Sequence, residues 1–214
     1  MYQRKKMFFY GVIIGVFYLA LLYLDCFGNK STDTNVLRYD KILIIFLETT
    51  FSLLGKENIK LWENCLWKLR LAVLIADFYF LFTPYAGAGI GSYMMVQYFY
   101  KKMRVQCHIN EERNSTFFEF TMIVFLVVIG ILGGDFALYT FGGIYAWLLV
   151  QNVKSTWNIV IQGKNEMYYL AVSLLFLACC DTSIFLYFLW DRRWIGNLIW
   201  FFYIPSQFLL AKYE

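Results

Sequence analysis

Long apolar stretches recur along the whole chain, and they constrain its fold more than any other feature of the sequence. A helix that crosses the ~30 Å hydrocarbon layer of a bilayer needs about 17–25 mostly apolar residues. Hydrophobic residues make up 60% of the 214 residues and charged residues only 16%, which argues against a water-soluble fold. We expect an all-α fold: a single transmembrane helical domain over residues 1–214, with about eight membrane-spanning helices. The predicted spans are 7–24, 41–54, 66–82, 88–100, 117–132, 136–153, 167–190 and 194–211.

The distribution of Lys and Arg gives this predicted bundle an orientation. With the N-terminus on the inner side, fourteen of the 19 basic residues fall in inner segments and five in outer segments. This bias follows the positive-inside rule and predicts that both termini are cytoplasmic. The first apolar run is too long for a signal peptide and lacks a small-residue cleavage site, so we expect it to be a span. We expect a multi-pass protein of a cell membrane, and the abundance of Ile, Phe, Tyr, Asn and Lys favours a bacterial inner membrane.

Several familiar kinds of site are not expected. The string Gly87-Ala-Gly-Ile-Gly91 opens a helix without a preceding strand, so it predicts close helix packing rather than a phosphate-binding loop. Five scattered cysteines and one histidine, His108, offer no ligand cluster, so we expect no metal and no cofactor. The net charge of +4 gives no reason to expect a nucleic-acid partner. The expected partners are the lipid bilayer and a lipid.

Three acidic residues lie inside predicted spans: Glu48, Asp77 and Asp181. An Asp near the middle of a span costs about 2.5–3.5 kcal/mol on insertion scales, so it is rarely found there without a role. Asp77 and Asp181 lie at similar depths in two spans that run in the same direction. If these helices are neighbours, the two carboxyls face one cavity and share a proton. Such a pair suits acid/base catalysis, in which one group donates a proton and the other activates water.

Structural roles compete with this hypothesis. Each Asp can instead hydrogen-bond a neighbouring helix through Tyr, Gln or Thr. For Glu48 the structural role is favoured, although Thr49, Thr50 and Ser52 beside it can also line a polar cavity. Two further pairs share a helix face, Gln97 with Tyr100 and Tyr203 with Gln207, and either lines a site or joins helices.

Five segments of the chain together carry a family resemblance. The first is Lys41, at the start of the second predicted span. The others are Ala76-Asp77 with the apolar run after it, Gly89 to Tyr100, Leu175-Phe176 to Cys180-Asp181-Thr182, and Trp200 to Tyr203 and Gln207. In these segments the chain resembles the YhhN-like lysoplasmalogenase family, eight-helix membrane proteins that include hydrolases of the vinyl-ether bond of lysoplasmalogens. It departs from the family pattern at Ile42, Ala76, Gln97 and Cys180, where the family favours Pro, Gly, His and Ser.

The resemblance implies hydrolysis of the vinyl ether of a lysoplasmalogen to a fatty aldehyde and a glycerophospho-alcohol. Asp77 and Asp181 would share the roles of acid and base, and Lys41 would meet the phosphate. The other predicted substrate-binding residues are Gln97, Tyr100, Tyr203 and Gln207. The alternative is a non-catalytic transporter, or a lipid- or solute-binding protein, that uses the buried carboxylates as a proton or cation site. An intramembrane aspartyl protease fits poorly. Gly133-Gly134-Asp135 does not match the Gly-x-Gly-Asp motif of those proteases, and it lies at a loop.

Overall fold

All of the regular structure in the described part of the chain is helical, which confirms the predicted all-α class. A computed structural model describes residues 11–20, 23, 34–54, 65–106, 116–190 and 192–212. After a helical segment at Gly11–Ala20 come α2 (Thr34–Leu54), α3 (Cys65–Phe82), α4 (Ala86–Gln106), α5 (Thr116–Leu132), α6 (Gly134–Ile161), a short 3-10 turn η2 (Asn165–Met167), α7 (Tyr168–Trp190) and α8 (Arg193–Lys212).

The chain forms two compact units. Unit 1 comprises Met1–Glu57 and Ser155–Glu214, and unit 2 comprises Asn58–Lys154, so the boundary falls within α6. The prediction of one domain concerns how these units fit together, and it stays a prediction.

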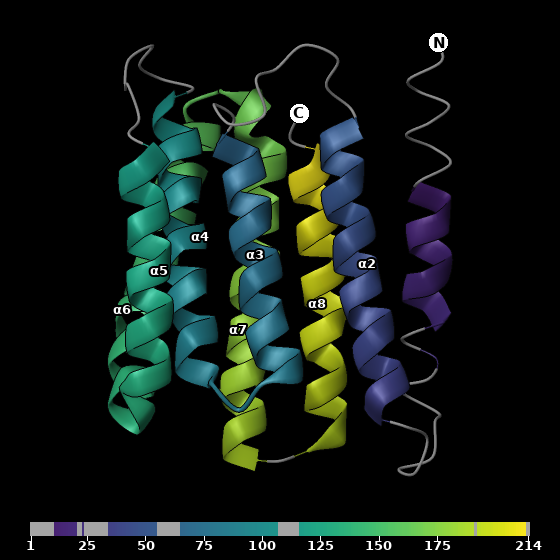
Figure 1. Ribbon diagram of the computed structural model, residues 1–214. Helices are drawn as coiled ribbons and strands as arrows, with labels where there is room; N and C mark the ends of the chain where they lie inside the picture. The colour runs from purple at the N-terminus through teal and green to yellow at the C-terminus, as the bar shows by residue number, and fades with distance from the viewer. Residues whose placement is uncertain are drawn as a thin grey trace. The chain divides into compact units, whose positions relative to one another are not determined.

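Within unit 2, α3, α4 and α5 run alternately down and up, and tight turns join α3 to α4 and α5 to α6 (Figure 1). The turn from α3 to α4 is short because Pro84 cannot continue a helix, and the Tyr85 N–H donates to the Thr83 hydroxyl at 3.2 Å. The next turn, from α5 to α6, contains Gly134 with a φ of +51°, a conformation that suits glycine.

Glycines hold α4 and α5 close together, as the sequence predicted for the Gly87–Gly91 string. A Cβ at Gly87 would lie 2.8 Å from the Gly130 carbonyl oxygen, and one at Gly91 would lie 3.0 Å from that of Leu126. A Cβ at Gly130 would lie 2.4 Å from the Ala88 backbone. The two backbones therefore approach more closely than larger side chains allow.

In unit 1, α7 and α8 form an antiparallel pair, and α2 runs beside α8 in the same direction (Figure 1). Two serines link α7 and α8: each hydroxyl, of Ser173 and of Ser206, donates to the other residue's carbonyl at 2.9 Å. These reciprocal bonds fix the register of the pair.

Three helices extend beyond their predicted spans. The first, α2, begins at Thr34 rather than at 41, while α4 continues to Gln106 and α6 to Ile161. The predicted loop at 101–116 is therefore wrong over its first six residues and at Thr116, where α5 begins. Hydropathy measures how much of a helix suits hydrocarbon, whereas backbone hydrogen bonds continue through polar turns at a helix end.

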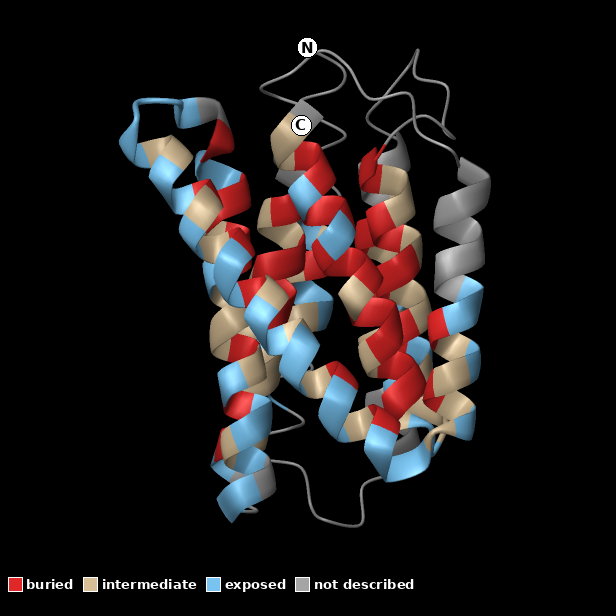
Figure 2. Ribbon diagram, turned by 90° about the vertical axis from the view of Figure 1, so that its left-hand side faces the viewer, coloured by how far each residue is buried: buried red, intermediate tan, exposed pale blue. Residues whose placement is uncertain are grey.

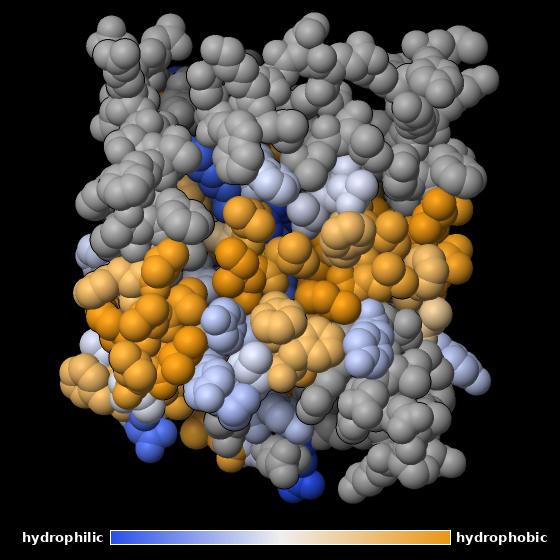
Figure 3. Space-filling model, in the orientation of Figure 1, coloured by the Kyte–Doolittle hydropathy of each residue, from blue (hydrophilic) through white to orange (hydrophobic). Residues whose placement is uncertain are grey.

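Large hydrophobic side chains are exposed on the outer faces of several helices. Figure 2 shows exposed positions in pale blue along α5 and α6, and Figure 3 shows hydrophobic side chains, in orange, over the described part of α5. The exposed residues of these two helices include Phe125, Val128, Leu132, Phe136, Tyr139, Ile144, Trp147, Val150 and Ile161. By length and composition, one helix of the described residues, Tyr168–Tyr187, is apolar enough to cross a membrane.

Candidate functional site

Asp77 lies in the second half of α3 and is held by a tyrosine of the next helix. The Tyr93 hydroxyl on α4 donates to Oδ1 of Asp77 at 3.0 Å. Both side chains are buried, and Asp77 exposes only 6% of its surface. A buried carboxyl needs such a donor, whether it joins two helices or is oriented for chemistry.

Tyr93 begins a polar stripe along one face of α4. Tyr93, Gln97, Tyr100 and Arg104 follow at spacings of four, three and four residues, which places them on one side of the helix. The ring of Tyr145 on α6 lies 5.9 Å from that of Tyr93, edge to face. The stripe therefore faces α6 over part of its length.

Further along this stripe, Asn152 of α6 bridges two residues of α4. Its Nδ2 donates to the Gln97 carbonyl oxygen at 2.8 Å and to Gln97 Oε1 at 3.0 Å. Its Oδ1 accepts from Arg104 Nη1 at 3.0 Å. Partial burial lowers the pKa of the Arg104 guanidinium from its ordinary value. Arg104, Asn152 and Gln97 therefore form one continuous hydrogen-bonded chain.

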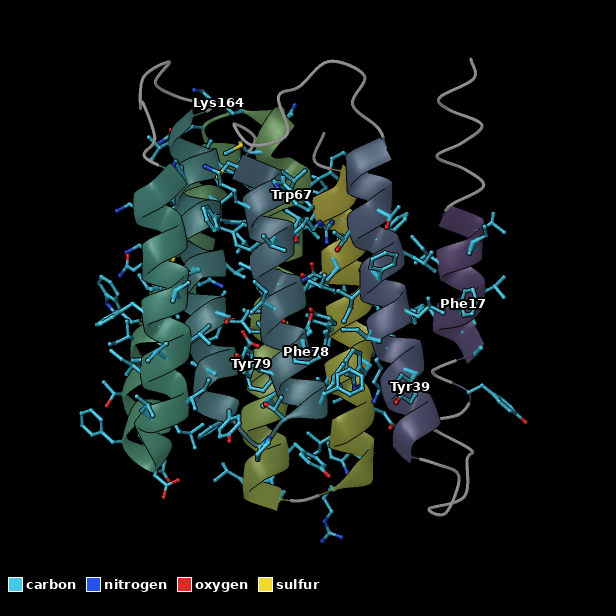
Figure 4. The ribbon with its side chains drawn as sticks, in the orientation of Figure 1. Phe17, Tyr39, Trp67, Phe78, Tyr79 and Lys164 are labelled. Carbon is cyan, nitrogen blue, oxygen red and sulfur yellow. The ribbon has the colours of Figure 1, made fainter. Side chains whose placement is uncertain are left out.

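The α3–α4 pair is polar at one end and aromatic at the other. A hydrogen bond from Cys65 Sγ to the Phe99 carbonyl, at 3.4 Å, sets the start of α3 beside the last turns of α4. Lys68 and Arg70 lie in the first two turns of α3, and Lys101, Lys102 and Arg104 lie in the last two turns of α4. The opposite end carries Phe78, Tyr79, Phe80 and Phe82. Figure 4 shows Trp67 near the first of these ends and Phe78 and Tyr79 toward the second.

Arg70 is a fully buried charge near the start of α3. Its side chain is 0% exposed, and the topology, which stays a prediction, counts it among the cytoplasmic basic residues. It lies seven residues before Asp77, on the same face of α3 and about 10 Å along the helix axis. A fully buried guanidinium needs anionic or polar partners, so Arg70 is a candidate functional residue.

In unit 1, Lys41 and Tyr203 meet at Trp200. The Lys41 ammonium lies 4.4 Å from the centroid of the Trp200 ring, and the Tyr203 ring packs edge-on against the same indole at 5.5 Å. The Ser173–Ser206 register places Asp181 of α7 level with position 198 of α8, within about 3 Å of the height of Trp200. Asp181 and Lys41 therefore lie at similar heights in this unit.

The hydroxyls next to Glu48 and Asp181 in unit 1 donate within their own helices. Thr182 donates to the Ala178 carbonyl and Ser183 to that of Cys179, both at 2.8 Å. Thr49 and Thr50, beside the fully buried Glu48, donate in the same way to Ile45 and Phe46. A hydroxyl has one proton to donate, so these four do not donate to the neighbouring carboxyls.

The predicted site residues thus divide between the two units. Asp77, Gln97 and Tyr100 belong to unit 2, whereas Lys41, Asp181, Tyr203 and Gln207 belong to unit 1. Gln97, Tyr100, Tyr203 and Gln207 are all buried, and Asp181 is partly exposed. The pairing of Asp77 with Asp181 stays a prediction.

Sequence reasoning missed Tyr93, Asn152 and Arg104 as members of the site. Tyr93 lies four residues before Gln97, so extending the Gln97–Tyr100 face by one turn would have found it. No local signal identifies Asn152, because its partners are 48 and 55 residues away in the chain.

Comparison of the chain with protein-family models, with curated proteins and with solved structures gives no match. The resemblance to the lysoplasmalogenase family therefore stays a hypothesis. No group of three or more His, Cys, Asp or Glu side chains that could hold a metal is found among the described residues.

Proposed function

We propose that the chain is a multi-pass membrane protein that hydrolyses the vinyl-ether bond of a lysophospholipid, with Asp77 and Asp181 as its catalytic carboxyls. The observation that carries the proposal is the order of side chains along α3 and α4. A basic end is followed by the Asp77–Tyr93 pair and then by an aromatic end. A lysoplasmalogen has the same order: an anionic phosphate, a vinyl ether and an apolar chain.

The exposed apolar faces of α5 and α6 support the membrane part of this proposal. Large hydrophobic side chains on the outside of a helix are costly in water, and they suit contact with lipid. In the predicted multi-pass topology, each described helix would be in contact with lipid.

The basic end of unit 2 is suited to the substrate phosphate. Arg70 carries a guanidinium, whose fork geometry fits a phosphate. From the phosphorus to the vinyl ether there are about six bonds, or roughly 7 Å at ~1.2 Å per bond, a span comparable with the ~10 Å rise between Arg70 and Asp77. The family resemblance gives the phosphate to Lys41 instead, but that ammonium lies over the Trp200 ring.

The chemistry requires a proton donor and an oriented water. A protonated carboxyl transfers its proton to the vinyl carbon farther from oxygen, and the other vinyl carbon becomes part of an oxocarbenium ion. Water adds to this carbon and gives up a proton to the second carboxylate. The hemiacetal then collapses to an aldehyde and an alcohol, and the two carboxyls return to their starting states by proton exchange.

We assign the base role to Asp77 and the acid role to Asp181. Tyr93 donates a hydrogen bond to Asp77, so the Asp77 carboxyl is the acceptor in this bond. A carboxylate that accepts a proton from water uses the same capacity.

Release of fatty aldehyde from lysoplasmalogen tests the proposal. Purified protein in lipid nanodiscs would be compared with Asp77→Asn, Asp181→Asn and a control, Asp135→Asn, whose side chain is exposed at the start of α6. Loss of general acid/base catalysis predicts a fall of about 10²–10⁴-fold for either of the first two, and no change for the control. Wild-type protein that releases no aldehyde would favour the transporter or binding-protein alternative.

A further inference from the structure

The hydrogen-bonded chain that ends at Gln97 has a fixed direction. A guanidinium can only donate, so the Asn152 atom that faces Arg104 must be the oxygen. The Asn152 amide nitrogen therefore faces Gln97, and because this nitrogen also only donates, the Gln97 atom that faces it is Oε1. Arginine thus decides the orientation of both amides.

This orientation leaves the Gln97 amide nitrogen as the outer end of the chain. The Gln97 side chain is 1% exposed, and its Nε2 has no hydrogen-bond acceptor among the described residues. A buried donor without an acceptor lowers the stability of the fold. Rotating the amide would not remove this cost, because Nε2 would then face Asn152 Nδ2, another donor.

We infer that Gln97 Nε2 donates to an oxygen of the bound lipid, and that this oxygen is the free hydroxyl on the central glycerol carbon of a lysophospholipid. The assignment rests on the proposed function and adds a specificity residue to it. Arg104 and Asn152 act through Gln97, as positioning residues.

The order of residues along α4 favours this hydroxyl. Gln97 lies four residues from Tyr93, or about 6 Å along the axis, on the side of the basic end. Tyr93 holds Asp77, where the vinyl ether would react. In a lysoplasmalogen the hydroxyl oxygen lies about five bonds from the carbon that is protonated, roughly 6 Å at ~1.2 Å per bond, and it lies on the phosphate side.

The test compares lysoplasmalogen with its 2-deoxy analogue, which lacks this oxygen. We expect wild-type kcat/KM to favour the natural lipid by about 10–100-fold, the equivalent of one hydrogen bond from a buried donor. The variant Gln97→Met has a similar length and no donor, so it should lose the preference for the natural lipid over the 2-deoxy lipid. The matched control Gln151→Met, at an exposed position of α6, should keep the wild-type ratio. A wild-type ratio near one, or an unchanged ratio in Gln97→Met, would overturn the inference.

A binding measurement separates this inference from the proposed function. A saturated 1-alkyl lysophospholipid, which has no vinyl ether to cleave, and its 2-deoxy form would be added and the rise in Tm measured. The hydroxyl-bearing lipid should raise the Tm of wild type more than the 2-deoxy lipid does, and the two should be equal for Gln97→Met. If wild type shows this difference in Tm but releases no aldehyde from lysoplasmalogen, the proposed function is wrong and the inference about Gln97 stands. Hydrolysis of both vinyl-ether lipids at equal rates would end the inference alone, and equal Tm shifts in wild type would also overturn it.

Discussion

At the scale of residues, the most informative contact is that between Tyr93 and Asp77. The sequence identified Asp77 from a physical cost, a carboxyl inside an apolar run, and suggested Tyr, Gln or Thr of a neighbouring helix as its partner without saying which residue. The phenol of the neighbouring helix supplies a hydrogen bond that both stabilises the buried carboxyl and fixes its direction. The same contact is expected whether Asp77 only joins two helices or is a catalytic carboxyl. A measurement of activity is needed to distinguish the two roles.

Tyr93→Phe removes this hydroxyl and keeps the ring. A hydrogen bond to a charged group contributes about 1.5–3 kcal/mol, so we expect kcat for aldehyde release to fall about 10–100-fold. Tyr139→Phe, on the exposed face of α6, is the control because that residue is 77% exposed. If Tyr93→Phe lowers the Tm but leaves kcat at the wild-type value, Tyr93 serves only to join α3 to α4.

At the scale of elements, close packing of α4 against α5 fixes where the polar stripe of α4 lies. The backbone of Gly130 approaches Ala88, and there is no room for a Cβ at Gly130. Gly142, in the interior of α6, has no neighbour within 4 Å of such a Cβ. Substitution by alanine is therefore expected to have opposite effects on stability at these two glycines.

We expect Gly130→Ala to lower stability by about 1–3 kcal/mol, because the clash is with backbone and forces the helices apart. Gly142→Ala should raise stability by about 0.5–1 kcal/mol, because alanine loses less backbone entropy in a helix. Thermal unfolding in detergent would show this as Tm shifts of opposite sign, at about 2–4 °C per kcal/mol. Equal shifts in the two variants would mean that α4 and α5 are not in close contact at Gly130.

The positions of these helices were largely predictable, whereas their ends and partners were not. Apolar length located α3, α5, α7 and α8 to within a residue or two, since each lies almost wholly in an apolar stretch. It placed the end of α4 too early, because four of the six residues from Lys101 to Gln106 are polar and the segment is still helical. It did not show that Arg70 is buried, because hydropathy carries no information about which face of a helix is buried.

The candidate site was predictable only where one helix contains its members. Gln97 and Tyr100 share a face through spacing alone. The link from Asn152 to Gln97 and Arg104 depends on how α6 packs on α4, and such packing is set by side-chain contacts along both helices.

At the scale of the whole molecule, the proposed topology predicts on which side of the membrane each turn between helices lies. Counting basic residues puts the turn between α6 and α7 inside and the turn between α5 and α6 outside. Lys164 and Asp135 are exposed residues of these two turns.

Single cysteines at these positions, introduced into a background without the native cysteines, would report this orientation. A maleimide that does not cross membranes should label Asp135→Cys in intact spheroplasts, and Lys164→Cys only after lysis. The reverse pattern would mean that the orientation is inverted. Labelling of both in intact spheroplasts would mean that the α6 region does not cross the membrane.

The most direct test of the central claim follows the solvent proton during hydrolysis. In D₂O, carbon protonation predicts that the released aldehyde carries one deuterium on the carbon next to its carbonyl, measured by mass spectrometry after immediate trapping. A sample of the same aldehyde, incubated without protein, gives the background exchange. In ¹⁸O-water the glycerophospho-alcohol should carry no ¹⁸O, because the bond from its oxygen to glycerol is not broken. No aldehyde above the protein-free control, or aldehyde without deuterium above background, would contradict vinyl-ether hydrolysis by this protein.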